Sequence, residues 1–247
     1  MEKFAHDTIT PNNNSSLEKK EQVAGMFNDI AHRYDLLNRM LSGGIDVYWR
    51  KRALRELKKQ PVNQLLDVAT GTAEVAIMAS KILQPNKIIG IDISDGMLEL
   101  GRKKIEKKGL NNIISLETGD SEHLRFNDDT FDAISVAFGV RNFQRLLQGI
   151  KEMYRVLQPG GKIVVLEFSK PTGIGLKQLY QLYMNYATPT VGKLVSNNRD
   201  AYEYLNKSVQ AFPEGENFLR IMQEAGFSNT YLKKLSFGIC TIYCGSK

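Results

Sequence analysis

Between residues 65 and 168 the chain alternates short apolar runs with longer stretches of helical periodicity, and few folds accommodate that alternation. The apolar runs have the length of buried strands, and the intervals between them have the length of helices. Strands joined by helices connect through right-handed crossovers and therefore lie parallel in one sheet. The predicted strands lie at 65–69, 88–92, 113–117, 131–137 and 162–168, and the predicted helices at 73–83, 96–108 and 144–157.

Both ends of the chain add elements to this α/β core. A helix predicted at 214–225 precedes two further apolar runs, at 230–235 and 238–243, which a tight turn would join as an antiparallel hairpin. The expected sheet is therefore seven-stranded and mostly parallel. At the other end, residues 17–60 carry helical periodicity and are predicted to form an N-terminal helical layer.

The chain has one core pattern and no internal repeat, which predicts a single domain over 17–247. Residues 1–16 are polar and lack periodicity, so we expect a disordered tail there. An insertion at 172–212 is rich in Leu, Tyr and Met between 176 and 186, which is typical of a lid over an elongated apolar ligand. An amphipathic helix packed on the sheet fits this pattern equally well.

Composition excludes little beyond the membrane and disulfide-rich classes. A chain of 247 residues with 42% apolar residues can bury one core without a metal or a disulfide. Cys240 and Cys244 lack a second Cys or His cluster, so we expect two packed thiols and no metal, as suits a reducing cytoplasm. No apolar run approaches the roughly 20 residues of a membrane span, and no signal peptide opens the chain. We therefore expect a cytoplasmic protein.

The loop after the first predicted strand indicates a nucleoside cofactor. Asp67 ends that strand, Gly71 supplies a small-residue turn, and Asp92 ends the second strand about 20 residues beyond the loop. A carboxylate there can accept hydrogen bonds from both ribose hydroxyls. At the end of the third strand, Asp120 can accept from the adenine amino group while Ser121 presents its backbone. The alternative, that these aspartates only cap the following helices, stays open.

The charges around this loop favour a cofactor without phosphate. A dinucleotide loop needs several glycines and a helix N-terminus that holds a pyrophosphate, but this loop has only Gly71, and Glu74 would repel phosphate. S-adenosylmethionine carries a sulfonium cation and no phosphate. Asp67 could bind its methionine ammonium directly or through a water. The sequence therefore predicts S-adenosylmethionine as the cofactor.

Several segments of the chain resemble known methyltransferases. The turn RVLQPGG at 155–161 resembles one common to many small-molecule methyltransferases. Four more segments resemble the ubiquinone/menaquinone C-methyltransferase family, with demethylmenaquinone methyltransferases as the nearest likeness. The likeness spans about residues 22–244. The four segments are YDLLN at 34–38 with its flanking Phe27 and Trp49, AFGVRN at 137–142, LEFSKP at 166–171 and YLNKSVQAFP at 204–213.

The resemblance implies a Rossmann-like class I S-adenosylmethionine-dependent methyltransferase that methylates a prenylated quinol, most simply demethylmenaquinol to menaquinol. Position by position, it places the family's cofactor contacts on Thr72, Asp92, Asp120 and Ser121. The loop departs from the family's pattern, which has more glycine and an Asp. The residues at those places here are Ala69, Thr70, Ala73 and Glu74. Because alanine tolerates most backbone angles, we expect the fold to persist.

A quinol ring carbon becomes nucleophilic only when a neighbouring hydroxyl loses its proton. We expect Arg141 to stabilise the resulting phenolate, directly or through a water, because a guanidinium acts by its charge and is rarely a base. Asn142 and Tyr34 would orient the ring. The alternatives are that Tyr34 is a packing residue and that Arg141 holds a loop.

The expected partners are the prenylated quinol and, transiently, a membrane surface. Basic stretches at 50–59 and 102–108 and a net charge of +6 would suit anionic lipid, although such stretches are commonly solvated helix faces. The sequence lacks the motifs of base-flipping enzymes, which argues against nucleic acid, and it is compatible with a homo-oligomer. Other acceptors stay open: the benzoquinol precursor of ubiquinone, a sterol or an amine. So does a non-catalytic binding module.

Overall fold

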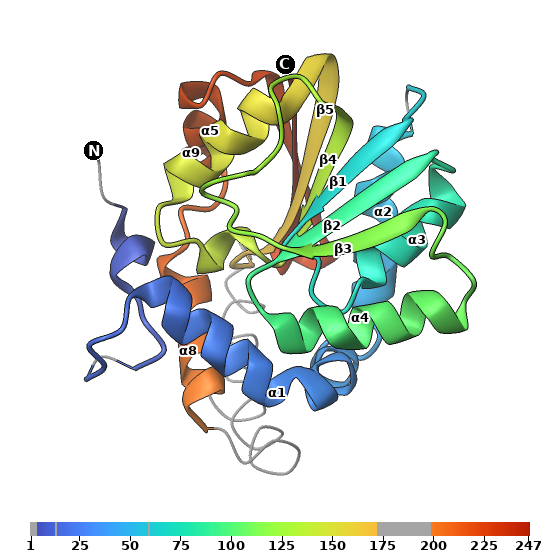
Figure 1. The fold of residues 1–247 in the computed structure, drawn as a ribbon. Coiled ribbons are helices and arrows are strands. Elements are labelled where there is room, and N and C mark those ends of the chain that lie inside the picture. Colours follow the sequence, from blue (N-terminus) through green and yellow to red (C-terminus); the bar gives the residue numbers. More distant parts are fainter. Residues whose placement is uncertain (1–3, 13, 59, 172–198) are drawn as a thin grey trace.

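The middle layer of the computed structural model is a seven-stranded sheet with the strand order β3-β2-β1-β4-β5-β7-β6 (Figure 1). Strands β1 to β5 pair in parallel and β6 pairs antiparallel with β7, as the sequence predicted. Strand β7 also pairs antiparallel with β5. The structure describes residues 4–12, 14–58, 60–171 and 199–247. The strands are β1 (Gln64–Val68), β2 (Lys87–Asp92), β3 (Ile114–Thr118), β4 (Phe131–Ala137), β5 (Leu157–Phe168), β6 (Ser228–Leu235) and β7 (Cys240–Ser246).

Helices cover both faces of this sheet, which explains why its parallel strands read as nearly continuous apolar runs. Leu66 and Val68 of β1 pack into a core shared with α5 (Leu146–Val156) and α9 (Glu216–Glu224). Leu65, one position along, faces the other side, where α2 (Ile45–Leu57), α3 (Glu74–Ile82) and α4 (Asp95–Lys107) pack. Because strand side chains alternate between faces, β1 contributes to both cores.

Within the N-terminal helical layer, α2 packs on a face of the sheet, and the helix before it lies at the carboxyl edge of the parallel strands. Helix α1 (Lys19–Leu41) packs along α4 and beside α8 (Arg199–Ala211), as Figure 1 shows. Val23 and Met26 of α1 form a small apolar cluster with Ala201 and Tyr204 of α8. Residues 172–198, which include the Leu, Tyr and Met stretch of the predicted lid, lie outside the described part of the chain. Within the described ranges, no helix is long and apolar enough to cross a membrane.

The N-terminal segment differs from the disordered tail predicted over residues 1–16. The short 3-10 helix η1 (Ala5–Thr8) packs on the domain, with His6 fully buried against the ring of Phe212. Lys19 donates from Nζ to the backbone oxygen of His6 over 2.7 Å. Burial, with the nearby charge of Lys19, lowers the pKa of His6 to about 3, so the ring is neutral. Composition missed this contact because two rings, those of Phe4 and of the neutral His6, suffice to hold an otherwise polar segment.

Candidate active site

The first cavity lies where the loops after β1, β2, β3 and β4 meet the inner side of α1. The predicted cofactor residues Gly71, Asp92, Asp120 and Ser121 all line it. They meet because the carboxyl ends of parallel strands share one edge of the sheet, where open α/β folds bind ligands. Including the open solvent at its mouth, the empty space measures about 690 Å³.

Asp92 is held rigidly on the wall of this cavity. Its Oδ2 accepts from the backbone N–H of Gly71 over 2.8 Å, and its Oδ1 accepts from the backbone N–H of Ser94 over 2.9 Å. Burial raises the pKa of Asp92 above its usual value, while these two backbone donors act to lower it. Each oxygen keeps a further acceptor position, so the carboxylate can bind two adjacent hydroxyls.

Asp120 and Ser121 form the part of the wall that follows β3. Asp120 accepts from the backbone N–H of Glu122 through Oδ1, and its Oδ2 forms an ion pair of 3.2 Å with Lys20 of α1. The pair links α1 to the cavity edge, and both side chains are about one-third exposed, so the link can open.

Two predicted cofactor residues, Asp67 and Thr72, are not among the described residues that line the cavity. The carboxylate of Asp67 is buried and accepts from Thr70 Oγ1 and Ser135 Oγ, both over 2.6 Å. Burial raises its pKa to about 6. Asp67 therefore stabilises the loop from outside the cavity. In this geometry its carboxylate does not make the predicted direct contact with the cofactor's ammonium group. The hydroxyl of Thr72 is likewise engaged elsewhere, by Asp35 and Lys104.

The two alanines of the loop after β1 adopt left-handed backbone angles. Ala69 has φ +53° and Ala73 has φ +63°. A left-handed alanine costs about 1 kcal/mol relative to the right-handed form, so the expectation that alanine fits here holds only with some strain. A Cβ on Gly139 would lie 2.5 Å from the Cβ of Ala69. Gly139 of the AFGVRN segment is therefore required for the close approach of the two loops.

A second cavity adjoins the first and is formed by α1, α8 and the 3-10 helix η2 (Val140–Asn142). It contains all three predicted catalytic residues, Tyr34, Arg141 and Asn142. Tyr34, Asn142 and Phe27 line both cavities, so these three side chains form the boundary between them. The remaining described lining residues are Met26, Ile30, Asn38, Ala201, Tyr204 and Leu205.

Arg141 is buried and paired with Glu167, a residue to which the sequence assigned no role. Its Nη1 donates to Glu167 Oε1 over 2.7 Å and to the backbone oxygen of Phe138 over 2.6 Å. Burial acts to lower the pKa of Arg141, but Glu167 and Tyr34 outweigh it and raise that pKa, so the guanidinium stays charged. Glu167 is fully buried at the end of the apolar strand β5, and a charged residue at such a position could have signalled it.

Comparison with known proteins identifies the family. The model of the ubiE/COQ5 methyltransferase family matches residues 15–247. The chain belongs to this family. It is 46% identical to a demethylmenaquinone methyltransferase of Bacteroides fragilis over 244 residues, or 99% of each chain. It is 45% identical to a ubiquinone/menaquinone biosynthesis C-methyltransferase of Geotalea daltonii, covering 93% of this chain and 98% of the relative.

Solved structures agree with the fold of this ubiE/COQ5 family member. An S-adenosylmethionine-dependent methyltransferase of Thermotoga maritima superposes with a TM-score of 0.64 at 18% identity, covering 91% of this chain and 99% of that one. One from Aquifex aeolicus gives a TM-score of 0.57 at 19% identity, covering 79% and 88%. The predicted Rossmann-like class I methyltransferase fold is confirmed.

The protein is an S-adenosylmethionine-dependent methyltransferase, and its first cavity fits that cofactor. Asp92 presents two fixed acceptors suited to ribose hydroxyls, and Asp120 adds a second carboxylate to the wall of the cavity. The loop between β1 and α3 lacks the repeated glycines of a pyrophosphate site, and Glu74 opens α3. A cation without phosphate suits this wall better than a nucleotide does.

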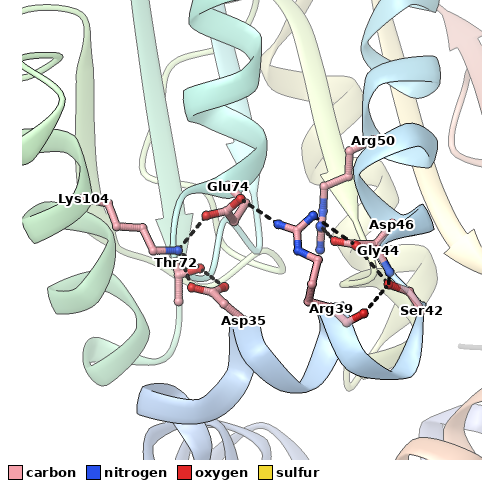
Figure 2. Close-up of polar contacts among 9 residues, drawn as sticks. All are labelled: Asp35, Arg39, Ser42, Gly44, Asp46, Arg50, Thr72, Glu74 and Lys104. Atoms are coloured by element: carbon pink, nitrogen blue, oxygen red, sulfur yellow. Dashed lines mark hydrogen bonds and ion pairs between the residues drawn. The ribbon is translucent and has the colours of Figure 1, made fainter.

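A polar network joins α1 to the cofactor loop (Figure 2). Lys104 of α4 lies at its centre and donates to Asp35 of α1, to Thr72 Oγ1 over 2.9 Å and to Glu74 Oε1 over 2.8 Å. Thr72 donates to Asp35 Oδ1 over 2.6 Å. Asp35 follows Tyr34 directly, so the network holds the helix at the boundary of the two cavities against the loop between β1 and α3, which lines the first cavity.

Replacing Lys104 with methionine should weaken S-adenosylmethionine binding several-fold, because Asp35 and Glu74 would then face each other without their shared cation. Calorimetric titration with S-adenosylmethionine measures this directly. Lys103→Met is the matched control, since Lys103 is exposed on the same helix and pairs with Glu99 of that helix. Equal affinities for the two variants would show that the network does not support the cofactor loop.

The same network extends to the turn between α1 and α2 and changes the interpretation of one basic stretch. Asp46 accepts from Ser42 Oγ over 2.9 Å, lies 3.4 Å from Arg39 and forms a close ion pair with Arg50 (Figure 2). Arg50 is buried and is therefore not available to lipid, contrary to its predicted place in a basic surface. Lys51 is exposed.

Proposed function

We propose that this protein methylates a ring carbon of a prenylated quinol, with demethylmenaquinol converted to menaquinol as the reaction. One observation carries the proposal: the cofactor cavity adjoins a second, largely apolar cavity, and Tyr34 and Asn142 belong to both. An acceptor in the second cavity would therefore face a methyl donor in the first. The names of the relatives in Bacteroides fragilis and Geotalea daltonii agree with this acceptor class.

The buried charge of Arg141 suits the phenolate that makes the ring carbon nucleophilic. Its Nη1 is occupied by Glu167 and Phe138, whereas its buried Nε has no hydrogen-bond partner among the described residues. A guanidinium N–H in a low-dielectric cavity stabilises an oxyanion strongly. Bound S-adenosylmethionine supplies the electrophilic methyl group. Arg141 would lower the pKa of the adjacent hydroxyl and hold the resulting negative charge.

Apolar side chains of the second cavity would hold the ring and exclude water. Met26 and Ile30 of α1 face it, and Ala201 and Leu205 of α8 contribute from the opposite helix. Phe27 and Tyr34 contact each other edge to face, with ring centroids 5.7 Å apart, at the boundary between the cavities. Such a wall aligns a flat ring with the donor and keeps the phenolate desolvated.

The decisive experiment supplies labelled S-adenosylmethionine with chemically reduced demethylmenaquinone. We expect label in the quinol product, and none when the oxidised quinone is supplied, because the oxidised ring cannot form a phenolate. Parallel reactions contain the benzoquinol precursor of ubiquinone, a sterol or an amine. Methylation of the benzoquinol alone would favour the second candidate acceptor, and methylation of the sterol or amine alone would refute quinol methylation.

We also propose that the turn between α1 and α2 contacts a membrane surface transiently, where a prenylated substrate resides. Four large apolar side chains are exposed around it: Leu36, Met40, Ile45 and Tyr48, with exposed fractions of 39–56%. The exposed Arg33 and Lys51 flank them, which suits anionic lipid. Asn38, between Leu36 and Met40, lines the second cavity, so the surface adjoins the proposed acceptor site.

Flotation with vesicles that contain anionic lipid tests this surface. We expect Met40→Glu to reduce the floated fraction several-fold, because it replaces an apolar contact with a repelled charge. Leu17→Glu, at an equally exposed apolar position just before the other end of α1, is the matched control and should float like the unmodified protein. Equal flotation of both variants would contradict the assignment.

A further inference from the structure

The second cavity is lined by a tyrosine whose hydroxyl group is buried. Tyr204 of α8 lines this cavity and is only 3% exposed. Its hydroxyl has no hydrogen-bond partner among the described residues. Burial raises the pKa of Tyr204 well above its usual value, so the group remains a neutral hydroxyl that can both donate and accept.

The orientation of Tyr204 is fixed by its ring and not by its hydroxyl. The ring packs in the small cluster with Val23, Met26 and Ala201, which joins α8 to α1. A phenylalanine would make the same apolar contacts. A buried hydroxyl without a partner destabilises a folded protein, so its presence here calls for a ligand that satisfies it.

Tyr204 is one of three unpaired polar groups at this cavity. Among the described residues, Arg141 Nε, Asn142 Oδ1 and the hydroxyl of Tyr204 are all buried and lack partners, and all three residues line it. The first is a donor, the second an acceptor, and the third can be either. A phenolic ring carries oxygens that match this set, since a phenolate accepts and a second hydroxyl donates.

We propose that Tyr204 is a substrate-binding residue whose hydroxyl hydrogen-bonds an oxygen of the quinol ring. The inference rests on the proposed function. It adds a contact between the quinol ring and α8 to the contacts that Arg141 and Asn142 of η2 would make with the same ring. Together these contacts would recognise the ring from two sides, with Arg141 and Asn142 on one element and Tyr204 on the other. Recognition by buried polar groups discriminates strongly against rings that lack the matching oxygen, because the groups are then left unpaired.

Tyr204→Phe separates substrate binding from a structural role. We expect KM for the quinol to rise about ten-fold, as for the loss of one hydrogen bond, with the Kd for S-adenosylmethionine unchanged. The melting temperature of the ligand-free variant should stay the same or rise, because an unsatisfied hydroxyl is removed. A structural hydroxyl would give the opposite pattern, a lower melting temperature with an unchanged KM.

Tyr243→Phe provides the matched control. Tyr243 is also fully buried, but its hydroxyl accepts from the backbone N–H of Gly215 over 2.8 Å. Its replacement should lower the melting temperature and leave KM for the quinol unchanged. If Tyr204→Phe leaves KM unchanged while the unmodified protein methylates the quinol, the inference is wrong and the proposed function stands. If the unmodified protein methylates no quinol, both fail together.

Discussion

Asp92→Ala should lower the affinity for S-adenosylmethionine by at least about 100-fold, because two hydrogen bonds from ribose hydroxyls to a fixed carboxylate are lost. The backbone N–H groups of Gly71 and Ser94 that hold the carboxylate would also lose their acceptor. Isothermal titration of the variant with S-adenosylmethionine measures the loss. Asp92→Asn keeps one acceptor oxygen, so its affinity for S-adenosylmethionine should lie between those of Asp92→Ala and the unmodified protein.

A nearby carboxylate provides the control for this prediction. Asp95 lies three residues further on, at the start of α4, and is exposed. Its carboxylate accepts a hydrogen bond from the hydroxyl of Thr118. Asp95→Ala should change the affinity by no more than a few-fold. Comparable losses for Asp92→Ala and Asp95→Ala would mean that general negative charge, and not a ribose contact, underlies binding.

Arg141→Met should lower kcat about 100- to 1000-fold, the usual result of removing a donor that stabilises an oxyanion. The same change leaves Glu167 buried without its cation, which should destabilise the fold by about 3–5 kcal/mol. Thermal unfolding and methyl-transfer kinetics with reduced demethylmenaquinone measure the two effects separately. Arg141 would thus contribute to both stability and chemistry.

The double variant Arg141→Met with Glu167→Gln distinguishes these contributions. Glu167 is fully buried, and its Oε1 also accepts from the backbone N–H of Phe168. A neutral glutamine removes the uncompensated charge, so stability should largely return while kcat stays low. Recovery of kcat in the double variant would show that Arg141 acts only by holding the loop of η2.

The strand-end positions of the cofactor site could be predicted from the sequence. Asp92, Asp120 and Ser121 follow strands whose apolar runs are easily recognised, and parallel strands bring such residues to one edge. Asp67 follows the same rule, but it is not among the described residues that line the cavity. Its side chain points to Thr70 and Ser135, and no local pattern encodes which partner a strand-end carboxylate chooses.

Contacts between distant segments could not be predicted in the same way. Arg141 and Glu167 are 26 residues apart in the sequence, and Lys104 and Asp35 are 69 residues apart. Resemblance placed Arg141 in the site, but nothing in the sequence paired it with Glu167. Packing between α1 and α8 decides the surroundings of Tyr204.

By itself, the sequence determined the α/β class, the seven strands, the residues at the carboxyl edge and the family. Those properties follow from the period of apolar residues along the chain and from short motifs, which are local. Only the tertiary structure decided which buried polar groups are paired and which are not. Pairing depends on the positions of side chains from separate segments in space. At the second cavity, burial makes the three unpaired groups costly enough to indicate a ligand.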